Sequence, residues 1–215
     1  MVTADADHRG DGAPARHGSD ERDGSLDRDD RSMRARMLAG DLYLADDPEL
    51  ADASRRARVL MDRFNRATDD EQGRTVLEEL LGAIGPDTEI RPPLYLDYGS
   101  HLTVGSRTFV NYGLTALDVA PIRIGDDVQI GPHVQLLTPT HPVEPGPRRA
   151  KWEAAQPIEI GDNVWLGGGV IVLAGVTIGA DSVVGAGAVV TRDLPAGVVA
   201  VGNPARVVRS VDDRT

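Results

Sequence analysis

The sequence predicts a mainly β protein, a parallel β-helix preceded by a small helical cap. One observation is an apolar residue at every sixth position: Ile160, Leu166, Val172, Ile178, Val184 and Val190. Another is a small or apolar residue four places after each: Val164, Val170, Val176, Ser182, Ala188 and Leu194. A helix repeats near 3.6 residues and a strand at 2. A period of six instead indicates a short strand and a turn, repeated as in a β-helix.

Residues 1–31 are predicted to form a disordered tail rich in Asp, Arg and Gly. After Met1, its only large aliphatic residues are Val2 and Leu26. So few apolar side chains cannot offset the entropy that the chain would lose on ordering. His8 and His17 lie in this tail, and we expect neither to have a specific role.

Residues 32–85 are predicted to form a small helical cap. Asp47 followed by Pro48 is typical of a helix start, and Thr68 with Glu71 has the spacing of a capping box. Two apolar stripes follow these starts: Ala53, Ala57, Leu60 and Phe64, then Val76, Leu77, Leu80, Leu81 and Ile84, ended by Gly85 and Pro86. An open strand edge invites aggregation, so we expect the cap to cover the first coil. A role in closing over a substrate is compatible with this.

Residues 86–209 are predicted to form the β-helix, followed by a short tail at 210–215. Three hexapeptides make one triangular coil, with lead residues pointing inward and coils stacked about 4.8 Å apart. Gly directly follows the lead residue in four repeats, and we interpret these glycines as permitting tight corner turns: Gly161, Gly167, Gly179 and Gly185. The period is interrupted at 111–123 and at 138–157, and the second stretch carries five prolines. Loops that leave a rigid scaffold often carry functional residues.

Composition excludes several classes of function. The chain has no Cys, which rules out disulfides, thiolate metal sites and a Cys nucleophile. Its net charge of −11 argues against general nucleic-acid binding. No apolar run could span a bilayer and no apolar signal core is present, so we expect a cytoplasmic protein without membrane association.

Several blocks of sequence make the chain resemble the hexapeptide-repeat acyltransferases, specifically the maltose, galactoside and nodulation O-acetyltransferases. The blocks occur in order over residues 33–209: Ala39-Gly40 with Leu42-Tyr43, Pro92-Pro93, Asp97-Tyr98-Gly99, Asn111-Tyr112, Leu117-Asp118, Ile130-Gly131-Pro132, Thr140-His141-Pro142, Ile160-Gly161-Asp162-Asn163-Val164-Trp165 and Gly202-Asn203-Pro204-Ala205. The resemblance implies a left-handed β-helix, an exception to the rule of right-handed crossovers. It also implies a homotrimer that uses acetyl-CoA, with active sites between subunits.

Acetyl transfer from a thioester to a hydroxyl needs a base for the hydroxyl proton and support for the developing oxyanion. Without Cys, a route through an enzyme thioester is excluded, whereas direct transfer needs only one His. Outside the tail there are three: His101, His133 and His141. The resemblance assigns the general base to His141, in its Thr-His-Pro context. We expect His133 at a coil corner and His101 on the surface of the first coil.

The resemblance also implies the binding residues, with no metal required. For a small hydroxylated acceptor, such as maltose, glucose or a galactoside, it points to Asp97, Asn111 and Asp118. Asp97 and Asp118-Val119 are closer to the maltose type than to the galactoside type. For acetyl-CoA it points to six residues: Trp165 as a wall of the thioester pocket, Gly168, Ala186 and Thr191 along the pantetheine arm, and Arg206 and Arg209 at the phosphate and adenine end.

Three other interpretations remain open. A metal-dependent β-helix enzyme such as a γ-type carbonic anhydrase would need three His around zinc, and the three His here lack that family's ligand spacing. A non-catalytic binding or scaffold protein on the same fold is the second, because a fold does not imply a function. The third is an acetyltransferase whose acceptor is an amino sugar or an antibiotic.

Overall fold

The structure is a computed structural model that describes residues 29–213. The chain divides into two units, Met1–Arg31 and Ser32–Thr215, and the second is described below. Most of the predicted tail, with His8 and His17, lies outside the described residues. No helix within 29–213 combines the length and apolar character needed to cross a membrane.

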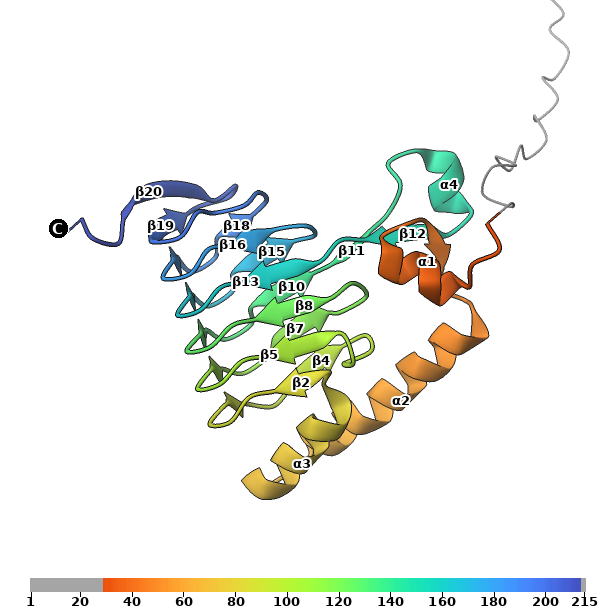
Figure 1. The fold of residues 1–215 in the computed structure, drawn as a ribbon, viewed down its shortest axis with the longest axis horizontal. Helices are drawn as coiled ribbons and strands as arrows, with labels where there is room; N and C mark the ends of the chain where they lie inside the picture. The colour runs from red at the N-terminus through yellow and green to blue at the C-terminus, as the bar shows by residue number, and fades with distance from the viewer. Residues whose placement is uncertain (1–28, 214–215) are drawn as a thin grey trace, which may run out of the picture. The chain divides into compact units, whose positions relative to one another are not determined.

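Short parallel strands stack into three faces, as the six-residue period predicts (Figure 1). Face 1 consists of β2 (Ala83–Ile84), β5 (Leu102–Val104), β8 (Ile122–Ile124), β13 (Ile158–Ile160) and β16 (Thr177–Ile178). Face 2 consists of β3 (Glu89–Ile90), β6 (Phe109–Val110), β9 (Gln129–Ile130), β14 (Trp165–Leu166), β17 (Val183–Val184), β19 (Val198–Val201) and β20 (Arg206–Ser210). Face 3 consists of β4 (Leu94–Leu96), β7 (Leu114–Leu117), β10 (Gln135–Leu137), β15 (Ile171–Leu173) and β18 (Val189–Val190). The parallel β-helix is thereby confirmed.

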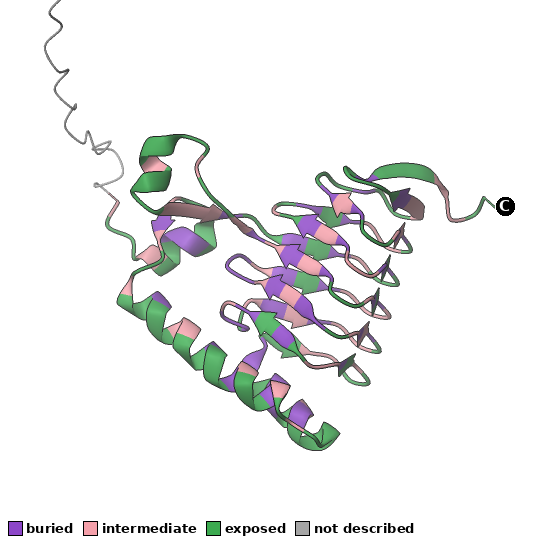
Figure 2. Cartoon of the chain, turned by 180° about the vertical axis from the view of Figure 1, so that it is seen from behind, coloured by how far each residue is buried: buried purple, intermediate pink, exposed green. Residues whose placement is uncertain are grey.

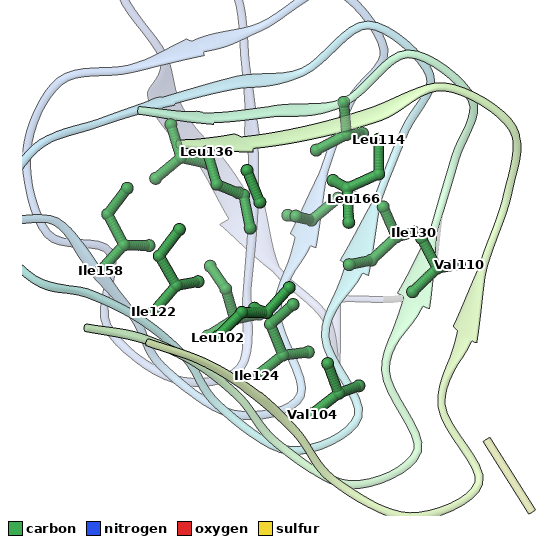
Figure 3. Close-up of a cluster of buried hydrophobic side chains, with 14 of the residues drawn as sticks. Leu102, Val104, Val110, Leu114, Ile122, Ile124, Ile130, Leu136, Ile158 and Leu166 are labelled. Carbon is green, nitrogen blue, oxygen red and sulfur yellow. The ribbon is translucent and has the colours of Figure 1, made fainter. Parts of the chain in front are cut away.

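The predicted lead residues form the interior of the coil. Leu166, Val172, Ile178, Val184 and Val190 are 0% exposed, and Ile160 is 3% exposed. Figure 3 shows side chains from the three faces pointing into one shared interior. Along most strands a buried residue stands beside an exposed or half-buried one, as the alternation of strand side chains requires (Figure 2).

The glycines after the lead residues have a different role from the one expected. Gly161 and Gly167 are not among the residues with a positive φ, so they are not needed for a left-handed turn. A Cβ on Gly161 would instead lie 2.6 Å from the backbone nitrogen of Ala180 in the next coil, and one on Gly167 would lie 2.6 Å from that of Ala186. Close stacking of backbones at the corners therefore excludes a side chain here.

The cap contains three helices, α1 (Met33–Ala39), α2 (Pro48–Asn65) and α3 (Asp70–Leu80). Asp47 caps α2 as predicted, its side chain accepting the Glu49 N–H. The predicted cap of α3 is Thr68, but the helix starts one residue later, because Asp69 caps it by accepting the Glu71 N–H. Buried faces of α2 and α3 continue the apolar core of the coil, which confirms that the cap covers its first turn.

The β-helix begins earlier than predicted. The expected cap extends to residue 85, whereas α3 ends at Leu80 and residues 83–84 already form β2. β2 pairs in parallel with β5 on face 1, so Ile84 belongs to the coil. Arg74 fixes this junction, because its guanidinium donates to the carbonyls of Ile84 (3.0 Å) and Gly85 (3.1 Å).

Extra residues gather at one corner of the coil, where the chain passes from face 3 to face 1. Equivalent positions on face 3 are Leu96, Ala116 and Leu136, each 20 residues after the last, then Val172 after 36 and Val190 after 18. Three hexapeptides account for 18 residues, so the first three coils carry insertions. We call these segments, 97–101, 118–121 and 138–157, the insertion corner.

The longest insertion is an arm that packs on the cap. It contains β11 (Pro139–Thr140), α4 (Pro145–Arg149) and β12 (Trp152–Ala155), and β12 pairs antiparallel with both β11 and β1 (Tyr43–Leu44). A second apolar core joins the cap, the arm and the two shorter insertions: Met37, Tyr43, Leu50, Tyr98, Val119, Ala120 and Ala155. The arm is thereby held between the coil and the cap.

Candidate active site

The insertion corner brings together three of the predicted site residues. Asp97 follows β4, Asp118 follows β7, and His141 follows β11 in the arm that leaves β10. Because β4, β7 and β10 are neighbours on face 3, these three segments stack on successive coils. The loop that begins with Asp97, the carboxylate of Asp118 and the His141 position therefore lie along the same corner of the coil.

Asp118 lies inside this corner and has no exposed surface. Its Oδ1 accepts the backbone N–H groups of Asp97 (3.1 Å) and Tyr98 (2.9 Å), and its Oδ2 accepts that of His101 (3.1 Å). This placement differs from the direct acceptor contact expected from the sequence. In the folded chain, the carboxylate of Asp118 holds the 97–101 loop.

Asp97 is half-buried among other acids, and its environment disfavours the ionised form. Burial raises the pKa of Asp97 from 3.8 to about 6, and the charges of Asp118 and Glu153 act in the same direction. Glu153 belongs to β12 and accepts the phenolic hydroxyl of Tyr43 at 2.8 Å. Burial, with this hydrogen bond, raises the pKa of Tyr43 far above its usual range.

His141 is exposed at the base of the arm, directly after β11. In the antiparallel ladder of β11 and β12, Pro139 lies opposite Ala155 and Thr140 opposite Ala154, so His141 directly follows the last paired residue. The backbone beyond His141 is held from α4, because the guanidinium of Arg148 donates to the carbonyls of Pro142 (3.1 Å) and Val143 (2.7 Å).

Of the other two His outside the tail, His101 belongs to the first segment of the insertion corner, and His133 lies elsewhere on the coil. His133 lies at a coil corner, as predicted, with a φ of 59°. His101 is expected on the surface, but it is half-buried, with Nδ1 2.8 Å from the carbonyl oxygen of Asp118 and its ring 5.5 Å from that of Tyr98. Within residues 29–213, no three His, Cys, Asp or Glu side chains are placed to hold a metal ion together.

A second corner, where the chain passes from face 2 to face 3, carries Asn111 and part of the predicted CoA set. We call segments 111–113, 131–133, 167–169 and 185–187 the glycine corner. Asn111 is half-buried, its Oδ1 accepts the N–H of Tyr112 at 2.8 Å, and its own N–H donates to the carbonyl of Ile130. Gly168 and Ala186 stand on later coils of the same corner.

The remaining predicted CoA residues spread over the C-terminal coils. Trp165 points outward from face 2 and is 56% exposed. Thr191 follows β18, at the face 3 to face 1 corner, and is exposed. Arg206 and Arg209 belong to β20, where each guanidinium donates to a nearby backbone carbonyl.

Within one chain, the predicted catalytic and acceptor residues lie at two separate corners rather than in one cleft. The insertion corner and the glycine corner border opposite ends of the face 3 strands. β7, which joins them in the second coil, is four residues long and spans about 13 Å at roughly 3.3 Å per residue. Asn111 and Asp118 therefore lie at opposite ends of the same strand.

Glu153 and Thr138 carry no signal in the sequence, and Tyr43 stands out there only as part of the Leu42-Tyr43 block of the family resemblance. All three lie at the junction of cap, arm and coil, where the six-residue period is absent. Tyr43 and Glu153 are 110 residues apart in sequence. Nothing in either local sequence signals their contact, which arises only when β12 pairs with β1.

Comparison with known proteins agrees with this architecture. Residues 36–85 match the family described as the maltose acetyltransferase hexapeptide capping motif, and residues 157–192 match the bacterial transferase hexapeptide family (six repeats). The chain is 45% identical to Nodulation protein L of Rhizobium meliloti over 179 residues, covering 82% of this chain and 98% of that protein. It is 38% identical to galactoside O-acetyltransferase of Escherichia coli over 184 residues, covering 85% and 91%.

A solved structure extends the similarity to three dimensions. The structure of a galactoside acetyltransferase in complex with coenzyme A matches with a TM-score of 0.82 and 37% identity, covering 85% of this chain and 92% of that one. Sequence and fold thus agree over nearly all of the Ser32–Thr215 unit. The chain belongs to the hexapeptide-repeat acetyltransferases, in the family of the maltose, galactoside and nodulation O-acetyltransferases.

Proposed function

We propose that the protein is an acetyl-CoA-dependent O-acetyltransferase that acts on a hydroxyl of a small acceptor, a sugar such as maltose, glucose or a galactoside. The observation that carries the proposal is His141, exposed on an arm that is fixed between cap and coil. Family membership supports it, as does the coenzyme A named in the related structure.

In the proposed mechanism, His141 accepts the hydroxyl proton while the acceptor oxygen attacks the acetyl carbonyl. The C–O bond forms, the C–S bond breaks, and CoA leaves as a thiolate that takes up the proton held by His141. No covalent enzyme intermediate is needed, which agrees with a chain that has no Cys. In the same scheme, Asp97 and Asn111 bind acceptor hydroxyls.

Acetyl-CoA is proposed to bind along the C-terminal coils. Trp165 is exposed and offers an apolar wall for the thioester, and Gly168 and Ala186 leave the backbone of the glycine corner accessible to the amides of the pantetheine arm. Thr191 would also contact the pantetheine part of acetyl-CoA. Arg206 and Arg209 supply cations for the phosphates.

We propose that the active site is completed between copies of the chain in a homotrimer. Two corners that carry the proposed residues border opposite ends of face 3, so one chain alone does not join them. The outward side chains of face 3 are largely apolar, and Tyr95 is 50% and Leu173 36% exposed. Face 1 instead carries polar outward residues, with Arg123 and Glu159 paired at 3.0 Å. We also propose a cytoplasmic location, because the reaction needs a supply of acetyl-CoA.

A mixing experiment tests the shared site. His141→Ala and Asn111→Ala chains, each of low activity alone, are unfolded together, refolded and assayed. If one subunit supplies His141 and its neighbour Asn111, random assembly restores up to about a quarter of wild-type activity. No gain over the separately refolded variants would mean that the two residues act within one chain or not at all.

The function itself is tested by an acceptor screen with acetyl-CoA that measures released thiol. Simple sugars, amino sugars and aminoglycoside antibiotics form separate arms of the screen. His141→Ala should lower kcat at least about 10²-fold while acetyl-CoA binding is retained. The control is His133→Asn, which keeps a residue that tolerates the positive φ and should stay within about 2-fold. Near-wild-type turnover of His141→Ala would refute the assigned base.

A further inference from the structure

Five polar or charged residues are buried in the described part of the chain: Arg36, Thr108, Asp118, Thr138 and Ser182. Asp118 and Thr138 belong to the insertion corner, and both are 0% exposed. Buried polar groups persist where their hydrogen bonds compensate for lost water. The partners of these two side chains therefore indicate what each one holds in place.

Thr138 stands at the base of the arm, three residues before His141. Its hydroxyl donates to the carbonyl of Leu117 (2.6 Å) and accepts the N–H of Ala120 (3.0 Å), so one side chain closes the second insertion. The carbonyl of Thr138 also accepts the N–H of Gln156 at 3.0 Å, which closes the arm on itself. The start of the arm is thereby fixed against the 118–121 segment.

Asp118 continues this chain of contacts into the first coil. It lies between the two residues that Thr138 binds, and its carboxylate holds the N–H groups of Asp97, Tyr98 and His101. The link runs from the His141 arm through Thr138 to segment 117–120, and from Asp118 to the Asp97 loop. Each step is a hydrogen bond between a fully buried side chain and backbone.

The same hydrogen-bond pattern occurs away from the proposed site. The hydroxyl of Thr108 donates to the carbonyl of Gly125 (2.9 Å) and accepts the N–H of Val128 (3.1 Å), and Thr108 is 1% exposed. It joins two coils at the face 1 to face 2 corner, which carries none of the proposed catalytic or acceptor residues. Thr108 and Thr138 are therefore matched in chemistry and burial but differ in location.

We propose that Asp118 and Thr138 are positioning residues for acetyl transfer, which fix the Asp97 loop relative to the arm that carries His141. The inference rests on the proposed function. In this inference Asp118 does not contact the acceptor itself but holds the loop that carries Asp97. Since a misplacement of about 1 Å can cost about 10²-fold in rate, loosening either link lowers turnover of the acceptor without removing a reacting group.

The test compares Thr138→Val with Thr108→Val in steady-state kinetics. Valine keeps the shape of threonine but removes both hydrogen bonds of the hydroxyl, which leaves the N–H of Ala120 or of Val128 without its side-chain acceptor, so both variants lose thermal stability. Thr138→Val should lower kcat/KM for the acceptor at least about 10-fold, with the KM for acetyl-CoA within about 2-fold. Thr108→Val should leave both within about 2-fold, and Thr138→Ser, which retains the hydroxyl, should recover most of the loss.

Asp118→Asn is the second variant and covers the case in which Thr138→Val does not fold. In this variant one carboxylate oxygen is replaced by an NH₂ group, which cannot accept the backbone N–H groups that Asp118 holds in the Asp97 loop. The same loss of kcat/KM for the acceptor is therefore expected. Equal kinetic effects of Thr138→Val and Thr108→Val, or unchanged acceptor kinetics in Asp118→Asn, would overturn the inference. An inactive wild-type protein across the whole acceptor screen would instead overturn the proposed function.

Discussion

Asp97 should make the protein less stable as the pH rises, and Asp97→Asn should remove that effect. In the folded chain the pKa of Asp97 is raised from 3.8 to about 6, by burial first and then by the charges of Asp118 and Glu153. Between these two values the folded state holds a proton that the unfolded state has released. The contribution is fully present below pH 3.8 and is lost as the pH rises through 6.

The two pKa values set the size of the effect. At 1.36 kcal/mol per pH unit, the penalty for ionised Asp97 reaches at most about 3 kcal/mol at pH 8. At pH 5, where folded Asp97 is largely protonated, the corresponding penalty is about 2 kcal/mol. Asn cannot ionise, so the advantage of Asp97→Asn in free energy of unfolding should grow by up to about 1 kcal/mol from pH 5 to pH 8. These are upper values, because solvent reaches part of the half-buried carboxyl and screens its charge.

Urea denaturation of both proteins at pH 5, 6.5 and 8 measures this difference, at one fixed subunit concentration because assembly adds to stability. The matched control is Asp46→Asn, which replaces an exposed carboxylate in the cap and should show no such trend with pH. An advantage of Asp97→Asn that is constant across the three pH values would refute the reasoning. Retaining a destabilising acid is expected where it serves activity.

Three further substitutions test the surroundings of the site and the coil. Glu153→Gln should lower the pKa of Asp97 below about 6 in a carboxyl ¹³C NMR titration, whereas the control Glu159→Gln on face 1 should leave it unchanged. An unchanged pKa of Asp97 in Glu153→Gln would contradict the repulsion between Asp97 and Glu153. Tyr43→Phe should lower the free energy of unfolding by about 1.5 to 3 kcal/mol in urea, because a buried hydrogen bond of 2.8 Å to Glu153 is lost; a difference below about 0.5 kcal/mol would argue against it. Gly167→Ala should cost about 1 to 3 kcal/mol because its Cβ would lie 2.6 Å from the Ala186 nitrogen, and Gly146→Ala, with nothing within 4 Å, should be neutral or stabilising.

Much of the scaffold follows from the sequence because burial in a coil is periodic. A side chain every sixth residue must face the interior, so Leu166 and Val172 can be placed there from their spacing alone. Asp47 with Pro48 marks a helix start through local chemistry alone. The departures from the period also indicate where the insertions lie, including the arm that carries His141.

The site could be predicted only in part. Sequence blocks point to His141, Asp97 and Asn111, but they carry no information on which corner each residue occupies. The buried position of Asp118 depends on three backbone N–H groups that turn toward it only in the folded loop. Its exposure could not be inferred from its neighbours in sequence.

The sequence by itself determined the coil, its core and the positions of its interruptions, because each depends on spacing along the chain. Tertiary structure alone decided that Glu153 stands beside Tyr43, since these two residues meet only through the pairing of β12 with β1. Tertiary structure likewise decided the raised pKa of Asp97, which results first from burial and then from the charges of Asp118 and Glu153. It also decided that glycine is required at 161 and 167 by the backbone of the next coil. Contacts between segments far apart in sequence depend on how the coils stack, and no local pattern encodes them.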